Sequence, residues 1–497
     1  MRRFREITRL ICTYGLMVGL STSITSYAME AKTTGEVFAS EMSIVNNSES
    51  EGINQEDNTQ QNSNPDSTNQ DNTNQEDNNT ENSDTENDRS KEGDTSTDNP
   101  EDSTQENDTT QEETKPTYKK INDSIYVKKA CSVYEKPDTK SKKLGTAILY
   151  RKYTRVGIGE DGYNQIMFDG AVAYVKESNV TTKKPTIPTN VVDITDTKYN
   201  YDDMKKDIQL LNTYYPDYVT VQSLGKSEDN REIYCIILGN VNAKNNILIQ
   251  GSMHAREYIN TQLLMAQLEY YLTQYEKGSY KSVSYQKMFD EVAVHVIPMA
   301  NPDGVTLCQY GTNKIADKKL IFALKTMQKS SNYSRWKANV KGVDLNKNFP
   351  FLWKKNVTEK KVGSMNYPGV KAQSESETQA LVKYTKSIKG LKVALSYHSM
   401  GNIIYWDYGQ KGKLREQCKE LVNLVKSITG YTLVTQSSST ISYGGYSDYV
   451  VGELGVPAIT IETGMVIAPV SHSQFNTIWK QNKTVIPEVI LQVIKNK

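Results

Sequence analysis

The sequence predicts an α/β fold for the C-terminal part of the chain, with a mixed, largely parallel twisted sheet flanked by helices. From Val191 onward, amphipathic helical segments alternate with short apolar strands, a pattern typical of a buried parallel sheet. Ahead of this part, short strand-like runs separated by polar turns predict a small all-β barrel. Before the barrel, a long polar stretch contains almost no apolar residue, which predicts a disordered linker.

Residues 1–28 have the pattern of a signal peptide. MRRFREITR is a basic start, LICTYGLMVGLSTSIT is an apolar stretch, and Ser26 and Ala28 are small residues at the two positions that a signal peptidase reads. The apolar stretch is shorter and more interrupted than the about 20 residues that a membrane span needs. We therefore expect cleavage after Ala28, secretion, and no membrane span in the mature chain. An uncleaved N-terminal anchor is the alternative.

The charge of the chain is divided between two opposed parts. Residues 29–117 carry 24 acidic and 4 basic residues, and residues 118–497 carry 34 acidic and 51 basic residues. The first part is therefore predicted to be a disordered acidic linker. The basic second part suits an anionic surface such as a bacterial wall, and a lysine-rich solvated exterior without a partner is the alternative. A nucleic-acid partner is not expected, because the positive charge is spread out and no helix-turn-helix pattern occurs.

Residues 118–183 contain five strand-like runs, namely SIYVKKACSVYEKP, KLGTAIL, YTRVGIG, YNQIMFDG and AVAYVKESNV. Polar turns at Asp138, Gly162 and Gly170 separate them, and five short strands in about 60 residues predict a barrel. The stretches YVKKACSVYEKPDTKSKKLGTA and GEDGYNQIMFDGAVAYVKESNV resemble a bacterial SH3-like wall-binding domain. The resemblance implies that this domain binds the bacterial cell wall. A proline-containing hinge, KKPTIPTN, leads into residues 184–497, the predicted catalytic domain.

Within residues 184–497, the helical segments YDDMKKDIQLLNTYYP and NTQLLMAQLEYYL alternate with the strands NNILIQG, VAVHVIP, LKVALSY and PAITIE. Ser374 and Glu377 are predicted to form a capping box for a further helix. In parallel sheets, active sites gather at the carboxyl ends of the strands. Four polar residues follow strand-like runs and are expected at this edge: His254, Asp303, His398 and Glu462.

A metal site is predicted from the histidines. His254 and Glu257 are three residues apart after a strand, close enough to bind one ion, and a His₂Glu set that leaves one position open is typical of catalytic zinc. The third ligand must come from far along the chain. The mature chain has two further histidines besides His398. His295 lies inside an apolar strand and His472 in a polar loop, so His398 is the candidate.

Five segments in order, GSMHAREY, PMANPDGV, KGVDLNKNFP, LSYHSMGN and ITIETG, resemble the zinc carboxypeptidases related to carboxypeptidase A. The resemblance extends from Tyr199 to Ile494. Within that family the chain is similar to the bacterial branch that includes γ-D-glutamyl-diamino acid peptidases, which often carry a wall-binding module. The resemblance implies an enzyme with one Zn²⁺ ion per chain.

The resemblance also implies roles for individual residues. His254 and Glu257 match the first two zinc ligands and His398 matches the third. Asp344 matches a carboxylate that orients a zinc-bound imidazole. Glu462 matches the general base, which takes a proton from the attacking water and passes it to the leaving amine.

Three departures from the family pattern bear on specificity. The arginine that stabilises the oxyanion falls on Lys337, with Arg335 two residues away as the alternative. The Asn-Arg pair that binds a substrate C-terminal carboxylate reads Asn346 and Lys347, and a lysine lacks the two-pronged guanidinium fork. The family's mobile tyrosine has no certain equivalent.

Two further residues are expected to contact substrate. Tyr443 is the predicted equivalent of the mobile tyrosine, and Tyr446 is the alternative. Arg256 matches a residue that contacts the substrate backbone, and a structural salt bridge is its alternative role.

We therefore expect a secreted, monomeric, wall-associated zinc peptidase that cuts the peptidoglycan stem at the γ-D-glutamyl–diamino acid bond. One alternative is a general metallocarboxypeptidase that trims peptides from their C-termini. An alternative of another class is a wall-binding protein without catalytic activity, which the intact ligand set and Glu462 argue against.

Overall fold

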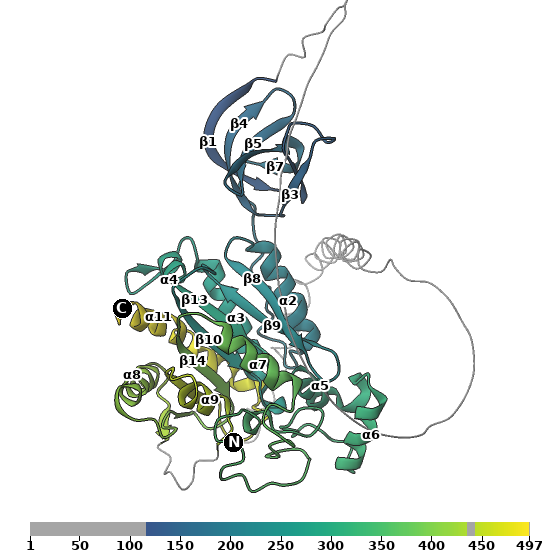
Figure 1. Ribbon diagram of the computed structural model, residues 1–497, viewed down its shortest axis with the longest axis vertical. Coiled ribbons are helices and arrows are strands. Elements are labelled where there is room, and N and C mark those ends of the chain that lie inside the picture. Colours follow the sequence, from purple (N-terminus) through teal and green to yellow (C-terminus); the bar gives the residue numbers. More distant parts are fainter. Residues whose placement is uncertain (1–115, 435–442, 497) are drawn as a thin grey trace, which may run out of the picture. The chain divides into compact units, whose positions relative to one another are not determined.

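The computed structural model of the protein describes residues 116–434 and 443–496 (Figure 1). The expected signal peptide, residues 1–28, and the expected acidic linker up to residue 115 lie outside the described residues and stay predictions. In the part of the chain that is described, no helix combines the length and apolar character needed to cross a membrane.

The barrel region forms one sheet of seven antiparallel strands in the order β3-β2-β6-β5-β4-β1-β7. Its inward side chains form an apolar core of their own, which includes Ile125, Val133 and Ile166. The prediction of five strands is wrong, because residues 128–130 break the first run and the 3-10 helix Glu177–Asn179 breaks the last. The strands are β1 (Tyr118–Val127), β2 (Cys131–Tyr134), β3 (Lys143–Ala147), β4 (Lys152–Gly159), β5 (Tyr163–Phe168), β6 (Ala171–Lys176) and β7 (Val180–Thr181).

A second sheet of eight strands has the order β16-β15-β17-β14-β10-β13-β9-β8. Its four central strands, β17, β14, β10 and β13, are parallel, and β9 and β8 continue the sheet in antiparallel pairing. The prediction of a mixed, largely parallel sheet is confirmed. The strands are β8 (Val219–Lys226), β9 (Glu232–Leu238), β10 (Asn245–Gly251), β13 (Val292–Ile297), β14 (Leu391–His398), β15 (Ile403–Tyr405), β16 (Thr432–Val434) and β17 (Ala458–Glu462), and a separate hairpin joins β11 (Ser279–Tyr280) to β12 (Val283–Ser284).

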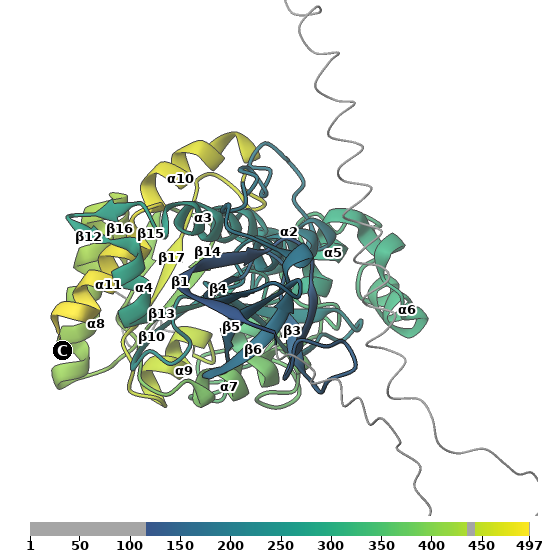
Figure 2. The ribbon, with the colours of Figure 1, turned by 90° about the horizontal axis from the view of Figure 1, so that it is seen from above.

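Helices cover both faces of this sheet. In Figure 2, α3 and α10 lie on one side of the central strands, and α7 and α9 lie on the other. Almost every side chain of β10 and β13 is buried between these layers, which explains why both strands read as continuous apolar runs. The helices are α2 (Tyr201–Tyr214), α3 (Ile259–Gln274), α4 (Tyr285–Glu291), α5 (Pro302–Tyr310), α6 (Lys318–Met327), α7 (Ser376–Ser387), α8 (Gly412–Thr429), α9 (Tyr446–Gly452), α10 (Phe475–Asn482) and α11 (Val485–Lys495).

The start of α7 differs from the prediction. The N-cap residue is Glu375, with no side-chain cap, so the capping box of Ser374 and Glu377 is wrong. The hydroxyl of Ser374 donates instead to Glu375, and Glu377 turns inward to Asn339. Long-range polar contacts therefore replace the local cap.

Candidate metal centre

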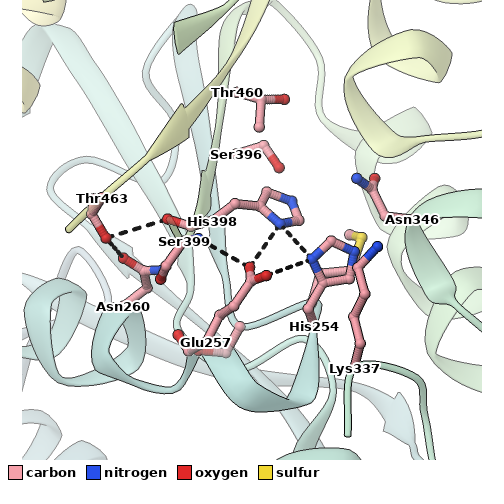
Figure 3. A network of polar contacts seen from close by, with 12 residues as sticks. His254, Glu257, Asn260, Lys337, Asn346, Ser396, His398, Ser399, Thr460 and Thr463 are labelled. Atoms are coloured by element: carbon pink, nitrogen blue, oxygen red, sulfur yellow. Dashed lines mark hydrogen bonds and ion pairs between the residues drawn. The ribbon is translucent and has the colours of Figure 1, made fainter. Parts of the chain in front are cut away.

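The fold brings His254, Glu257 and His398 to one edge of the central sheet. Strands β10 and β14 pair in parallel, with Gly251 opposite Tyr397, so their carboxyl ends lie side by side. His398 is the last residue of β14, and His254 follows β10 by three residues. The short 3-10 helix Ala255–Glu257 then turns the chain so that Glu257 points back toward both imidazoles (Figure 3).

The three side chains converge through their potential ligand atoms. Nδ1 of His254 lies 2.9 Å from one carboxylate oxygen of Glu257, and Nδ1 of His398 lies 2.9 Å from the other. The two Nδ1 atoms lie 3.0 Å apart, and all three side chains are buried (Figure 3). Two nitrogen lone pairs and a carboxylate thus face one small space.

These residues fit a zinc ion. In neutral imidazoles the two Nδ1 lone pairs and the carboxylate are all acceptors, so a cation or protons must lie between them. Two His nitrogens and one carboxylate are a donor set of catalytic zinc, which keeps a further position open. Burial alone raises the pKa of Glu257, but in the absence of a metal ion protonated His254 and His398 outweigh it and hold the pKa below its ordinary value. The carboxylate is therefore ionised, as a zinc ligand must be.

Asp344 lies directly behind His254. One oxygen of its fully buried carboxylate is 3.2 Å from Nε2 of His254, on the side of the ring opposite Glu257, and the other is 2.8 Å from Nζ of Lys337. Burial raises the pKa of Asp344, but the charges of Lys337 and His254 outweigh it and hold the pKa well below its ordinary value. An ionised carboxylate in this position fixes the ring orientation and the tautomer of His254.

Glu462 ends β17, in parallel register beside His398. Burial and the negative charge of Glu257 raise the pKa of Glu462 to about 8. The positive charges of His398, Lys337 and Arg256 act in the opposite direction. A bound zinc ion would also lower this pKa, because a cation favours the ionised carboxylate. Glu462 is thus a carboxyl group next to the metal ligands whose pKa lies closer to neutrality than that of an ordinary glutamate.

The oxyanion candidate Lys337 lies beside His254 (Figure 3), and its ammonium group contacts Asp344 at 2.8 Å. Burial lowers the pKa of Lys337, but the charge of Asp344 outweighs it and raises the pKa. The alternative, Arg335, is exposed. Its carbonyl oxygen accepts a hydrogen bond of 3.3 Å from Arg256. Of the two candidates, Lys337 is the one whose charge lies against a partner of the metal ligands.

Asn346 and Lys347 lie on the 3-10 helix Leu345–Lys347, which Asp344 caps by accepting from the backbone N–H of Asn346. The segment from residue 443 to 448 packs against this helix. The backbone N–H of Tyr446 donates to the Asn346 side chain at 2.9 Å. Gly444 has φ of +91°, and a Cβ there would lie 2.8 Å from the carbonyl oxygen of Lys347, so only glycine fits. Burial lowers the pKa of Lys347.

The two tyrosine candidates lie away from the ligand cluster. Tyr443 is buried against the ring of Phe351, with the ammonium of Lys355 4.9 Å from its own ring centre. The ring of Tyr446 packs against Phe349 in the core. Neither tyrosine makes a polar contact with the three ligand side chains among the described residues. The assignment of a mobile tyrosine to Tyr443 stays a prediction.

Arg256 contributes positive charge close to the ligands. Its one hydrogen bond runs to the carbonyl of Arg335, and no carboxylate of the described residues forms an ion pair with it. Among the described residues, Arg256 therefore does not form the structural salt bridge that was its alternative role.

Asp303 does not join the site, although it was expected at the same edge of the sheet. Its carboxylate accepts from the hydroxyl of Ser227 and from the backbone N–H of Asp229, and it pairs with Arg231 at 2.8 Å. These contacts satisfy the hydrogen-bonding capacity of a buried carboxylate, so the role of Asp303 is structural and not catalytic.

The sequence pattern missed a chain of polar residues behind Glu257. The backbone N–H of Ser399 donates to Glu257, and its hydroxyl accepts from Asn260. Asn260 in turn accepts from Thr463, whose backbone N–H donates to the carbonyl of His398 (Figure 3). Ser399 directly follows His398, and Thr463 directly follows Glu462. This adjacency is the sequence feature from which these polar residues could have been found.

The chain is similar in sequence to known proteins. Residues 204–485 match the zinc carboxypeptidase family. The chain is 30% identical over 288 residues to gamma-D-glutamyl-L-diamino acid endopeptidase 1 of Lysinibacillus sphaericus, covering 57% of this chain and 70% of that protein. It is 28% identical over 251 residues to carboxypeptidase B of Rattus norvegicus, covering 50% and 56%. The crystal structure of thrombin activatable fibrinolysis inhibitor matches with a TM-score of 0.49 and 20% identity, covering 60% of this chain and 75% of that one.

The family match spans more than half of the chain and includes every residue of the ligand cluster. The chain is therefore a metallopeptidase of the zinc carboxypeptidase family, and zinc is its cofactor.

Proposed function

We propose that this zinc peptidase is a secreted, wall-associated, monomeric enzyme that hydrolyses the γ-D-glutamyl–diamino acid bond of the peptidoglycan stem. The observation that carries this proposal is the similarity to the Lysinibacillus endopeptidase, which extends over 70% of that protein. The lysine at position 347, where the family has a guanidinium group, adds independent support.

His254, Glu257 and His398 would hold the zinc ion, since their ligand atoms converge. Zinc bound there would supply a Lewis acid for the scissile carbonyl and for the attacking water. Glu462, beside His398 in the sheet, accepts the proton that the attacking water loses and delivers it to the leaving nitrogen. Its raised pKa suits both transfers, because a base poised near neutrality both takes and releases a proton easily.

Lys337 is the proposed oxyanion partner. Asp344 holds its ammonium at 2.8 Å, so a fixed positive charge lies next to the ligand cluster, where negative charge develops on the carbonyl oxygen. Arg256, which has no carboxylate partner among the described residues, is proposed to contact the substrate backbone.

Asn346 and Lys347 are proposed to bind a substrate carboxylate. Residues 443–448 pack against both: the backbone N–H of Tyr446 donates to the side-chain oxygen of Asn346, and Gly444 lies against the carbonyl oxygen of Lys347. A lysine ammonium is a point charge on a flexible stem and does not impose the paired geometry of a guanidinium on a main-chain terminal carboxylate. Such a group can bind a carboxylate at varied positions, including the one on the side chain of a diamino acid.

The barrel, β1–β7, is proposed to be an SH3-like wall-binding domain. Its separate apolar core and the excess of basic residues in 118–497 support an independent domain on a protein that binds an anionic wall.

The test compares two substrate classes with the zinc-loaded enzyme. Purified stem peptides with a γ-D-glutamyl–diamino acid bond and ordinary peptides with a free C-terminal L-residue are digested, and the products are identified by mass spectrometry. We expect a higher kcat/KM for the stem peptides and cleavage at the γ-D-glutamyl bond. A preference for ordinary peptides would establish the general metallocarboxypeptidase, for which the similarity to rat carboxypeptidase B is the supporting observation. The absence of any product from either class would favour a non-catalytic wall-binding protein.

A further inference from the structure

Three acidic side chains form a second group of potential metal ligands, apart from the zinc site. Glu228 lies between β8 and β9, and Glu375 and Glu377 lie at the start of α7. Carboxylate oxygens from the three lie within 4.8 Å of one another. Glu375 is 2% exposed and Glu377 is 1% exposed. We refer to these three residues as the acidic cluster.

The hydrogen bonds of the acidic cluster are incomplete. The side-chain amide of Asn339 donates to Glu375 at 2.8 Å and only at 3.4 Å to Oε2 of Glu377. Oε1 of Glu377 is buried and has no hydrogen-bond partner in the described part of the chain. A buried carboxylate oxygen without a partner is costly, so the vacant lone pairs point to a ligand.

The charges around the acidic cluster do not balance. Lys341 lies 3.4 Å from Glu228 and 3.3 Å from Glu375, and Arg231 pairs with both Asp229 and Asp303 nearby. The pKa of Glu377 is raised well above its ordinary value. Burial is the largest cause, and the negative charge of Asp303 is the next. The negative charges of Asp303, Glu228 and Glu375 thus all act on Glu377, and Lys341 is the basic side chain that contacts the acidic cluster in the described part of the chain.

We propose that the acidic cluster binds a calcium ion. All donors offered by the acidic cluster are oxygens, which suit calcium rather than zinc, whose usual ligands include nitrogen or sulfur. Calcium accepts irregular protein cages, whereas magnesium usually keeps several waters. Oxygens up to 4.8 Å apart match an ion with ligands at about 2.4 Å on either side. The side chains of Glu228 and Lys341 are 19% and 39% exposed, so the acidic cluster opens to solvent at this end.

The acidic cluster is hydrogen-bonded to the loop of residues 337–348, which contains Lys337 and Asp344. Asn339, which bonds to Glu375 and Glu377, lies between Lys337 and Asp344. At the other end of the loop, the side-chain amide of Asn348 donates to Ser374, the residue before Glu375. An ion in the acidic cluster would therefore stabilise the loop of residues 337–348 and, through it, the partners of the zinc ligands.

Thermal unfolding of the zinc-loaded full chain tests the proposal, with zinc present throughout and calcium removed or added. Calcium at about 100 times its dissociation constant is expected to raise Tm by about 5 °C or more, and magnesium at the same concentration by much less. In Glu377→Gln the calcium-dependent rise is expected to be lost. Without calcium, this variant is expected to melt at or above the wild-type temperature, because the substitution removes repulsion.

Glu488→Gln is the matched control, because Glu488 is a buried glutamate like Glu377 but pairs with Lys281 and lies outside the acidic cluster. It should keep the full calcium-dependent rise in Tm. Equilibrium dialysis with radioactive calcium adds a direct count: wild type should bind one more ion per chain than Glu377→Gln. The acidic residues of the segment 29–117 are present in both chains and cancel in this difference.

Two outcomes would overturn the proposal. One is an unchanged calcium-dependent rise in Glu377→Gln. The other is a wild-type Tm that does not respond to calcium while Glu377→Gln is stabilised, which would show that the acidic cluster holds a proton and not a cation.

Discussion

Asp344 contacts the imidazole of His254 at Nε2, the ring nitrogen that points away from Glu257 and His398. Its carboxylate oxygen lies 3.2 Å from this nitrogen. Glu257 approaches the opposite nitrogen of the same ring at 2.9 Å. The imidazole is therefore held from both sides, and its Nδ1 lone pair is directed into the space shared with His398. This relationship predicts that the metal affinity depends on a residue that is not itself a ligand.

Asp344→Asn is expected to weaken zinc binding by about 10–100-fold, because a neutral amide orients the imidazole less firmly and makes it less basic. Competition with a chelator of known zinc affinity measures the change. Asp407→Asn, which alters an acid paired with Arg415 away from the site, is the control and should leave the affinity unchanged. Wild-type zinc affinity in Asp344→Asn would show that the contact does not act on the metal.

Glu462→Gln is expected to retain zinc and substrate binding but to lose about 10²–10⁴-fold in kcat, since the amide cannot accept the proton. Zinc analysis, substrate affinity and turnover of the same preparation separate these effects. Glu453→Gln, on the segment just before β17, should behave as wild type, because that exposed acid pairs with Lys386. More than about a tenth of wild-type turnover in Glu462→Gln would exclude it as the base.

In the pH profile of kcat/KM, the apparent pKa of the acidic limb is expected to lie above the ordinary glutamate pKa of 4.5 and below 8. A general base must be deprotonated, so activity falls as the pH drops below the pKa of Glu462. Burial and Glu257 raise that pKa to about 8, and the charge of bound zinc lowers it from there. The pH profile with a small soluble substrate measures the limb. A limb at or below 4.5 would mean that Glu462 is not held in the environment described.

Lys347→Arg is expected to improve cleavage of ordinary peptides with a free C-terminal carboxylate relative to stem peptides. The guanidinium binds both oxygens of a terminal carboxylate at once, which an ammonium does not. The ratio of kcat/KM for the two substrate classes is compared between wild type and variant. Lys361→Arg makes the same change at an exposed lysine and should leave the ratio unchanged. An unchanged ratio in Lys347→Arg would remove this residue from substrate selection.

Deletion of residues 118–181 is expected to release the enzyme from isolated cell walls and to leave turnover of small soluble stem peptides nearly unchanged. The strands removed have their own apolar core, so the eight-stranded sheet keeps its packing. Co-sedimentation with walls and turnover of the soluble substrate are measured on the same samples. Loss of both would mean that the barrel supports catalysis directly.

The zinc ligands could be predicted from the sequence because the fold places strand ends together by a general rule. His254 and His398 each follow an apolar strand, and in a parallel sheet such positions meet at one edge. The same rule predicts that Asp303 joins the site, and this prediction is wrong, because its side chain binds Arg231 and Ser227 instead. The rule gives the location of a backbone segment but not the partner of a side chain. The partner of Asp303 is Arg231, which is 72 residues away in the sequence.

The start of α7 shows the same limit for local patterns. Ser374 and Glu377 have the spacing of a capping box, yet Glu377 faces Asn339, which is 38 residues away. The positions of Tyr443 and Tyr446 likewise depend on the rings of Phe351 and Phe349, and no local spacing encodes such packing. The helices and strands of the α/β part and the largely parallel character of its sheet followed from periodicity, whereas side-chain partners depended on distant contacts.

The separation of the ligands along the chain has a consequence for the order of events in folding. His254 and His398 are 144 residues apart, and they meet only because β10 and β14 pair in parallel. An unfolded chain thus offers zinc only the local pair of His254 and Glu257, so the metal cannot act as the nucleus of folding. The sheet must form first and receive the ion afterwards. Zinc then binds the native state more tightly than the unfolded state, and the difference between the two binding free energies opposes unfolding.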